Sequence, residues 1–470
     1  MIDFLELCGF RSDEIESQLP RIRKVFSKIG ITDEDIERGK QRLNKYYDME
    51  LQGVRKIFRL YIRGLADLVL AREEGKEMIM YGLMSPGIEI MSSALMTRSN
   101  KVFSANPQRF FSNVVGNIFG KLDPVLEAAE KKWLKAGAVA HCANVKMYVG
   151  LLELGFIPKP DLLVTCGFLC DTAPKTADMM QELWGIPTHC YDTCKDMETM
   201  DDPREREVIG LGVKSLRGLA ARLQYMVGIE ITDDMIWEVI NAGKPYGAAS
   251  LKLDTLIAQS DPLPISSTHH NIFYRLGGSS CNIDDFPLQV DAINTLYEEV
   301  QERVSSGYAA VEKGAPRIFC TMPPSESDPR LEHMIGELGI ANVASENRLY
   351  PPDGRRSMDR ERPKDPYEAM CSTLYSSMYQ TPKARIPALI GFCKRLKVDG
   401  VLDRYHAGCR SGALDAMLIR SAITKELDIP VLLLEWENFD PRVYDHEQYK
   451  RRFEVFKTMM LQRRGKTSPQ

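Results

Sequence analysis

Three cysteines of this chain stand where a loop passes into a helix. Cys142 precedes a helical segment, Cys170 follows an apolar strand pattern, and Cys409 follows another strand, with Arg410 beside it. A helix N-terminus and a nearby arginine both favour the thiolate, which is the form that binds metals. Three thiolates that converge from two halves of the chain could hold a cubane iron–sulfur cluster and leave one iron open. From spacing alone, scattered core cysteines remain the alternative.

The chain has eleven cysteines, and the others give weaker signals. No CxxC pair and no CxxCxxC run is present, which argues against a zinc ribbon and a ferredoxin-like site. We expect Cys320 and Cys393 to lie in the core, because they fall inside secondary-structure elements. The remaining cysteines either flank strand ends or lack supporting context: Cys8, Cys166, Cys190, Cys194, Cys281 and Cys371.

Other catalytic motifs are absent from the sequence. It contains no GxxxxGK[ST] and no strand-linked GxGxxG, so nothing indicates a nucleotide-binding loop. Neither a GxSxG elbow nor an HExxH helix occurs. The pair His269-His270 is isolated, and we expect an exposed or structural role for it.

Length and composition describe an ordinary cytoplasmic protein. With 470 residues, two or three domains are expected. Hydrophobic residues make up 44% and charged residues 27%, and 61 basic against 65 acidic side chains give a net charge of −4. This balance gives no sign of nucleic-acid binding. No apolar run is long enough to span a membrane, and the first residues do not resemble a secretory signal.

Short apolar runs that alternate with helical stretches predict an α/β fold with two doubly wound parallel-sheet lobes. The expected strands lie at 78–81, 160–165, 186–191, 317–321, 341–344, 399–403 and 430–435. Helical spacing predicts an N-terminal arm over 1–75, including a long amphipathic stretch at 34–71 that Thr32 caps. The first lobe is expected over 76–260, a helical connector over 261–314 and the second lobe over 315–470.

An ordered set of segments resembles the superfamily of 2-hydroxyacyl-CoA dehydratases and benzoyl-CoA reductases. The segment from Pro160 to Asp171 is similar to its second cluster-cysteine motif, with Lys175 in the following helix. Cys142 stands where the first ligand is expected. The segment 398–412 matches the third motif, and 429–442 with the closing helix resembles the C-terminal signature. The resemblance covers about residues 75–461.

The resemblance implies that Cys142, Cys170 and Cys409 hold a [4Fe-4S] cluster. Cys166 is the rival of Cys170, but its position in the motif suits a core or supporting role better. The segment Ser85 to Glu89 resembles a family segment near the substrate pocket, so both residues become catalytic candidates; a plain helix start is the alternative. Family members work with a second related subunit and with a separate ATP-dependent iron–sulfur activator protein.

The implied reaction is elimination of water from a 2-hydroxyacyl-CoA. One electron added to the thioester gives a ketyl radical anion that expels hydroxide and makes the β-hydrogen acidic, and the electron returns afterwards. Such chemistry belongs mainly to the cofactor, while the protein positions the acyl-CoA and excludes water. A subunit of a benzoyl-CoA-reductase-type enzyme and a non-catalytic, cluster-carrying electron-transfer subunit are the alternatives.

Overall fold

Two four-stranded parallel sheets organise the chain. The computed structural model describes residues 1–133, 141–193, 204–273, 276–277, 281–322, 325–346, 363–375, 381–406 and 408–467. The first sheet has the order β2-β1-β3-β4 and the second the order β6-β5-β7-β8. Their strands are β1 (Met78–Leu83), β2 (Val102–Ala105), β3 (Leu162–Cys166), β4 (Thr188–Tyr191), β5 (Arg317–Thr321), β6 (Ala341–Ser345), β7 (Gly400–Asp403) and β8 (Val431–Leu433). The predicted fold class, two doubly wound α/β lobes, is confirmed.

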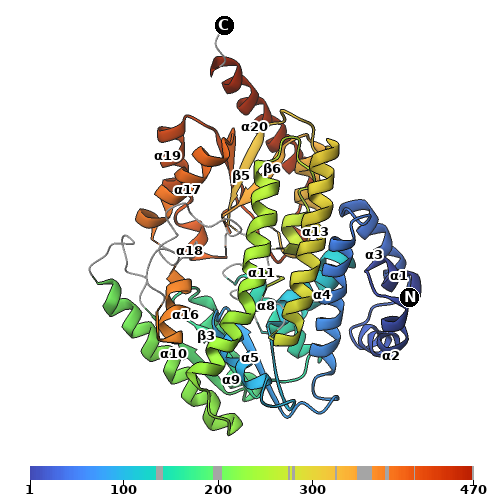
Figure 1. The fold of residues 1–470 in the computed structure, drawn as a ribbon, viewed down its shortest axis with the longest axis vertical. Coiled ribbons are helices and arrows are strands. Elements are labelled where there is room, and N and C mark those ends of the chain that lie inside the picture. Colours follow the sequence, from blue (N-terminus) through green and yellow to red (C-terminus); the bar gives the residue numbers. More distant parts are fainter. Residues whose placement is uncertain are drawn as a thin grey trace.

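Each sheet is built around two buried central strands. β1 pairs with β3 from Met80↔Leu162 to Leu83↔Thr165, and β5 pairs with β7 from Ile318↔Gly400 to Thr321↔Asp403. Since all pairings are parallel, the carboxyl ends of the strands in each sheet lie at one edge. In doubly wound sheets this edge is where ligands bind. In Figure 1 the second sheet lies above the first.

Helices connect the strands of the first lobe and place two cysteines at its ligand-binding edge. They are α5 (Ile88–Met96), α6 (Pro107–Phe110), the π-helix η1 (Phe111–Ile118), α7 (Asp123–Lys132), α8 (Ala143–Glu153) and α9 (Thr172–Trp184). Because α8 leads back to the start of β3, its N-terminus lies at the carboxyl edge of the sheet. Cys142 immediately precedes that N-terminus.

Long helices link the two lobes and complete the second. Along the chain, the elements between the strands of the first sheet and those of the second are α10 (Glu205–Val227), α11 (Asp233–Gln259), α12 (His269–Phe273), η3 (Ile283–Asp285) and α13 (Phe286–Ser306). The second lobe has α14 (Arg330–Glu337), α16 (Pro366–Tyr375), α17 (Pro382–Leu396), α18 (Arg410–Ala413), α19 (Ala416–Leu427), η4 (Pro441–Val443) and α20 (His446–Thr467). Among the described residues no helix is long and apolar enough to cross a membrane.

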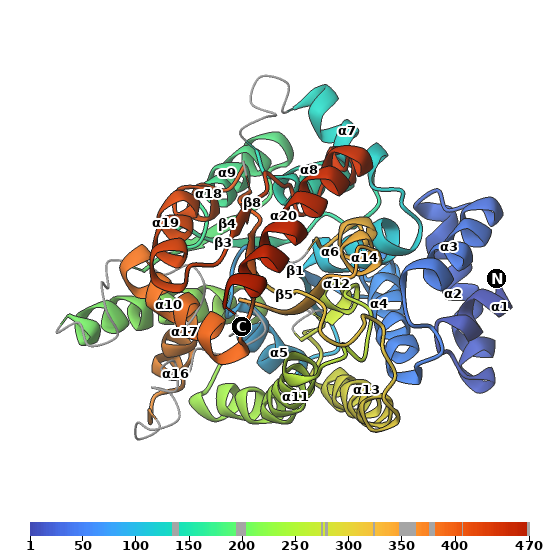
Figure 2. The same cartoon turned by 90° about the horizontal axis from the view of Figure 1, so that it is seen from above.

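The N-terminal helices pack on the first lobe. They are α1 (Ile2–Leu7), α2 (Ser12–Lys28), α3 (Asp33–Tyr46) and α4 (Gln52–Leu70), and they lie on the opposite side of the molecule from α10, α16 and α19 (Figure 2). Thr32 caps α3 as predicted, since its hydroxyl accepts a hydrogen bond from the Asp35 amide. The rings of Phe4 and Phe26 meet Phe119 of the first lobe at 5.6 and 5.3 Å. The domain boundaries remain a prediction.

Two sequence expectations differ from the structure. The stretch 34–71 is two helices rather than one, because the chain is extended at Tyr47 and Leu51 between α3 and α4. β2 was not expected. All four of its residues are buried, but they include Ser104 and Ala105, so its strand conformation comes from pairing with β1 rather than from a local β-forming pattern.

Candidate functional site

The two lobes meet at Cys142. Gly408, in the loop after β7, lies so close that a Cβ atom there would be 3.2 Å from both the Cα and the backbone nitrogen of Cys142. A side chain at this position would press on the start of α8, so glycine allows the two backbones to touch. Nearby, the side-chain amide of Asn117 donates a 3.2 Å hydrogen bond to the Glu326 carbonyl of the other lobe. The loops at the two carboxyl edges therefore form one continuous site.

The Cys142 thiol is surrounded by groups that disfavour its ionisation. Burial raises its pKa most, followed by the Glu437 carboxylate and then by the thiols of Cys170 and Cys409, while the Asn144 amide at the start of α8 acts the other way. The influence of Cys170 and Cys409 requires both to lie near Cys142. The structure thus brings the three predicted cluster cysteines to one place, two from the first lobe and one from the second.

Backbone amides support the other two cysteines. The Cys170 sulfur accepts a 3.4 Å hydrogen bond from the Ala173 amide at the first turn of α9. This position at a helix N-terminus agrees with the expectation from the sequence. Cys409 precedes α18, and its own amide donates a 2.9 Å hydrogen bond to the His406 carbonyl. Each cysteine is partly exposed, as a ligand to a shared group would have to be.

Cys166 occupies a different position. It is the last residue of β3, is fully buried, and its thiol donates a 2.7 Å hydrogen bond to the Met84 carbonyl after β1. Burial raises its pKa strongly. With its sulfur turned to a backbone carbonyl beneath the site, Cys166 suits a core role better than a ligand role.

The other described cysteines, apart from Cys190, are buried in the protein core. Burial raises the pKa of the Cys320 thiol in β5 to about 11 and that of the Cys393 thiol in α17 to about 12. Cys8, Cys281 and Cys371 are also buried, whereas Cys190 at the end of β4 is exposed. Cys194 lies outside the described residues.

The pair His269-His270 is buried. The His269 Nδ1 atom lies 2.6 Å from the Ser266 carbonyl and the His270 Nε2 atom 3.1 Å from the Asn342 carbonyl, which indicates a structural role for both.

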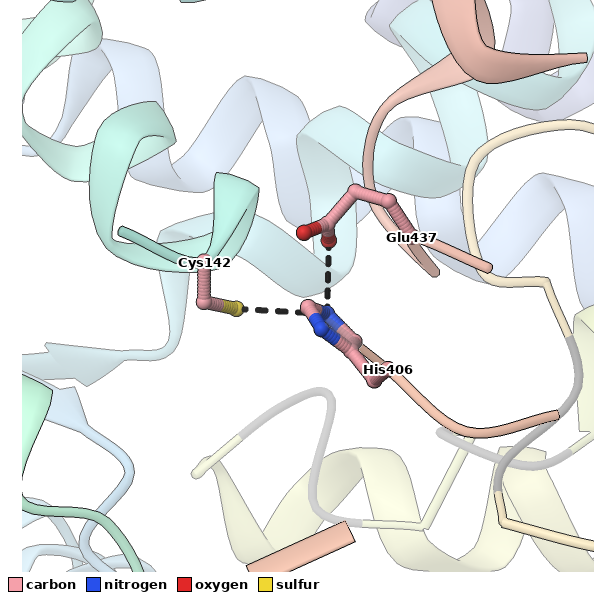
Figure 3. A group of neighbouring side chains, drawn as sticks. All are labelled: Cys142, His406 and Glu437. Atoms are coloured by element: carbon pink, nitrogen blue, oxygen red, sulfur yellow. Dashed lines mark hydrogen bonds and ion pairs between the residues drawn. The ribbon is translucent and has the colours of Figure 1, made fainter. Parts of the chain in front are cut away.

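His406 and Glu437 complete the surroundings of Cys142, and neither was singled out from the sequence (Figure 3). The His406 Nε2 atom lies 3.6 Å from the Cys142 sulfur and 2.7 Å from a Glu437 carboxylate oxygen. The donor atoms of the three residues lie within 4.8 Å of one another, close enough to hold a metal ion. Their position in the sequence could have indicated a role in the site, because both residues follow adjacent strands, β7 and β8, at the carboxyl edge.

A buried ion pair fixes the chain just before His406. Arg404 and Glu332 are both fully buried and form a salt bridge, and Glu332 also accepts a 3.1 Å hydrogen bond from the Ser325 amide. Burial raises the pKa of the Glu332 carboxyl, while Arg404 acts against the shift. Removing either partner would leave an unpaired buried charge, so this pair makes the end of β7 rigid.

A second group of buried charges lies at the ends of β6 and β7. The Arg385 guanidinium binds both carboxylate oxygens of Glu346, at 2.7 and 2.8 Å, and approaches Asp415 at 3.4 Å. Burial raises the pKa of the neighbouring Asp403 to about 6, although Thr321 and Arg385 both act to lower it. The second lobe therefore carries buried charged groups at the edge from which its one cysteine of the predicted set, Cys409, projects.

Of the two predicted catalytic residues, Ser85 lies in the turn after β1 and Glu89 in the first turn of α5. Glu89 accepts hydrogen bonds from the Gly87 amide at 3.0 Å and the Asn106 side chain at 2.9 Å, and pairs with Arg109 at 3.1 Å. These partners fix Glu89 as part of a helix start. Ser85 is buried, and its hydroxyl has no hydrogen-bond partner among the described residues.

Comparison with known proteins gives the family. A family model described as 2-hydroxyglutaryl-CoA dehydratase, D-component, matches residues 111–460. The chain belongs to this family. A benzoyl-CoA reductase subunit from Thauera aromatica is 21% identical over 350 residues, which cover 70% of this chain and 78% of that protein. The resemblance stated from the sequence is confirmed, and this dehydratase-family chain is similar to components of enzymes with more than one subunit.

The matched range divides the predicted site residues of this dehydratase-family chain. Cys142, Cys170 and Cys409 all fall within residues 111–460, whereas Ser85 and Glu89 precede them. The family supports an enzyme role of the dehydratase or reductase kind. Its match gives no separate support to Ser85 and Glu89.

Proposed function

We propose that this chain is the iron–sulfur subunit of a 2-hydroxyacyl-CoA dehydratase, with Cys142, Cys170 and Cys409 as the protein ligands of a [4Fe-4S] cluster. The observation that carries the proposal is the backbone contact between Gly408 and Cys142, which brings the Cys409 loop of the second lobe to the start of α8 in the first. Within a dehydratase family, this set of donors at the carboxyl edges is best explained by a shared cofactor.

The chemistry of the donor set fits such a group. The thiols of Cys170 and Cys409 raise the pKa of the Cys142 thiol, and bound iron would remove that repulsion because it neutralises the charge of the thiolates. The amides at the starts of α8 and α9 stabilise the deprotonated sulfurs further. A cluster ligated by only three cysteines would supply one-electron chemistry and an open, Lewis-acidic iron.

We further propose that Ser85 and Glu89 act on the substrate side of this site. The Asn144 side chain at the start of α8 donates a 3.2 Å hydrogen bond to the Met84 sulfur, which joins the turn after β1 to the cysteine loop. The buried Ser85 hydroxyl has an unused donor that suits an oxygen of the acyl group. Glu89, held by Arg109, would keep the turn in place.

The proposal includes partners that the family resemblance implies: a second related subunit, an ATP-dependent iron–sulfur activator and an acyl-CoA. A benzoyl-CoA-reductase-type subunit is the second candidate, because the relative from Thauera aromatica carries that name. A non-catalytic electron-transfer subunit would share the cluster but show no substrate dependence.

An anaerobic assay separates these functions. The tagged chain is purified from its own cells so that its partner subunit and activator are retained, and is then given ATP, a reductant and either 2-hydroxyacyl-CoA esters or benzoyl-CoA. The proposal predicts formation of 2-enoyl-CoA, lost in Cys409→Ser and retained in Cys393→Ser. Reduction of benzoyl-CoA without dehydration would support the second candidate, and activity that survives in Cys409→Ser would contradict both.

A further inference from the structure

His406 stands between two hydrogen-bond acceptors. Its Nε2 atom lies 2.7 Å from the Glu437 carboxylate and 3.6 Å from the Cys142 sulfur (Figure 3). A ring nitrogen that faces a carboxylate at this distance carries the proton, because two lone pairs would repel each other. With the proton on Nε2, the N–H group can donate to the Cys142 sulfur at 3.6 Å, while the Glu437 carboxylate lies 2.7 Å from the same nitrogen.

The backbone holds this arrangement firmly. His406 forms a bridge with Trp436, the residue before Glu437, so that both side chains project from adjacent extended segments beyond β7 and β8. Trp436 and His406 are buried, and the Trp436 amide donates a 3.1 Å hydrogen bond to the Tyr405 carbonyl. Through its own carbonyl, His406 also binds the Cys409 amide at 2.9 Å. One residue thus contacts two of the three proposed ligands.

We propose that His406 is a positioning residue that donates a hydrogen bond to the Cys142 sulfur and so sets the reduction potential of the cluster, with Glu437 fixing the imidazole. This inference rests on the proposed function. Hydrogen bonds to ligand sulfurs withdraw electron density and stabilise the reduced state, which carries more negative charge. The Glu437 carboxylate acts oppositely through its charge. His406 therefore raises the potential and Glu437 lowers it.

The test is a redox titration of the anaerobically reconstituted chain, followed by electron paramagnetic resonance. His406→Leu removes the donor, His406→Gln keeps an N–H donor, and Glu437→Gln keeps an acceptor for the imidazole while removing the charge. His446→Leu, at the exposed start of α20, is the matched control. We expect a lower potential in His406→Leu, partial restoration in His406→Gln, a higher potential in Glu437→Gln and no change in the control.

Two results would overturn the inference. The first is a wild-type potential in His406→Leu. The second is a strong nitrogen hyperfine coupling in the wild-type spectrum that disappears in His406→Leu, because it would make His406 a direct ligand. If His406→Leu fails to take up iron, the potential of His406→Gln decides, because a value below that of the wild type supports the inference and a wild-type value contradicts it. A wild-type chain that binds no cluster would instead defeat the proposed function itself.

Discussion

The two sheets share one topology, but their carboxyl edges carry different chemistry. Both have the order of two central strands flanked by one strand on each side. At the first edge, Cys142 and Cys170 stand at the starts of helices. The second edge has buried ion pairs such as Arg404–Glu332 and a single cysteine of the proposed set.

This difference indicates a division of labour between the lobes. The first lobe supplies two cysteines of the proposed set, each beside a helix N-terminus. The second lobe supplies a rigid charged frame that holds His406 and the Cys409 loop against Cys142. Fixed supporting groups of this kind are what orient ligands in metal sites. The following predictions test the two halves of this comparison separately.

The largest effect is expected for the cysteines of both edges. Serine in place of Cys142, Cys170 or Cys409 should remove most of the bound iron, because each substitution deletes one of the three proposed protein ligands. Cys393→Ser, a buried cysteine of α17, is the control and should retain its iron. Iron and sulfide are measured on each anaerobically purified variant. Equal retention in Cys409→Ser and Cys393→Ser would show that the ligand assignment is wrong.

Breaking the buried pair of the second lobe should destabilise the fold strongly. Glu332→Gln leaves the fully buried Arg404 charge without a counter-ion, at a cost of about 3–5 kcal/mol. Glu89→Gln in the first lobe, where the pair with Arg109 is less buried, should cost only about 1 kcal/mol. Urea denaturation followed by circular dichroism compares the two. Similar losses would remove the proposed contrast between the edges.

The charged frame should also show a pH dependence. Burial raises the pKa of Asp403 to about 6 from an ordinary value of 3.8, so the folded state holds its proton more tightly than the unfolded state. Its contribution is complete below about pH 4 and is lost as the pH rises through 6. Asp403→Asn should therefore gain up to about 3 kcal/mol relative to wild type at pH 8 and nothing at pH 4. Thermal unfolding at both pH values measures this, and a gain at pH 4 alone would contradict it.

A small effect, on stability alone, is expected at Cys166. Cys166→Ala removes the hydrogen bond to the Met84 carbonyl and a small buried volume, which should cost about 1–2 kcal/mol of stability. Iron content should remain that of the wild type. A loss of iron as large as that of Cys170→Ser would instead make Cys166 the ligand from this turn.

The sequence predicted the fold class and the position of the cysteine loops because these depend on local patterns. Continuous apolar runs mark buried parallel strands, and Cys142 and Cys170 stand next to helical periodicity. β2 was missed because its short segment gains its identity only by pairing with β1. Likewise, His406 and Glu437 lie 31 positions apart in the chain, and only the alignment of β7 with β8 brings them together. Such contacts depend on register, which spacing alone does not determine.

Iron and acid-labile sulfide analysis of the anaerobically purified wild-type chain, with its visible spectrum, tests the shared cofactor most directly. If both lobes bind one cluster, we expect about four irons and four sulfides per chain and a broad absorption band at roughly 400 nm, as is typical of thiolate-bound iron–sulfur centres. A colourless, folded protein without iron, even after reconstitution, would contradict the account and return Cys142, Cys170 and Cys409 to a structural role.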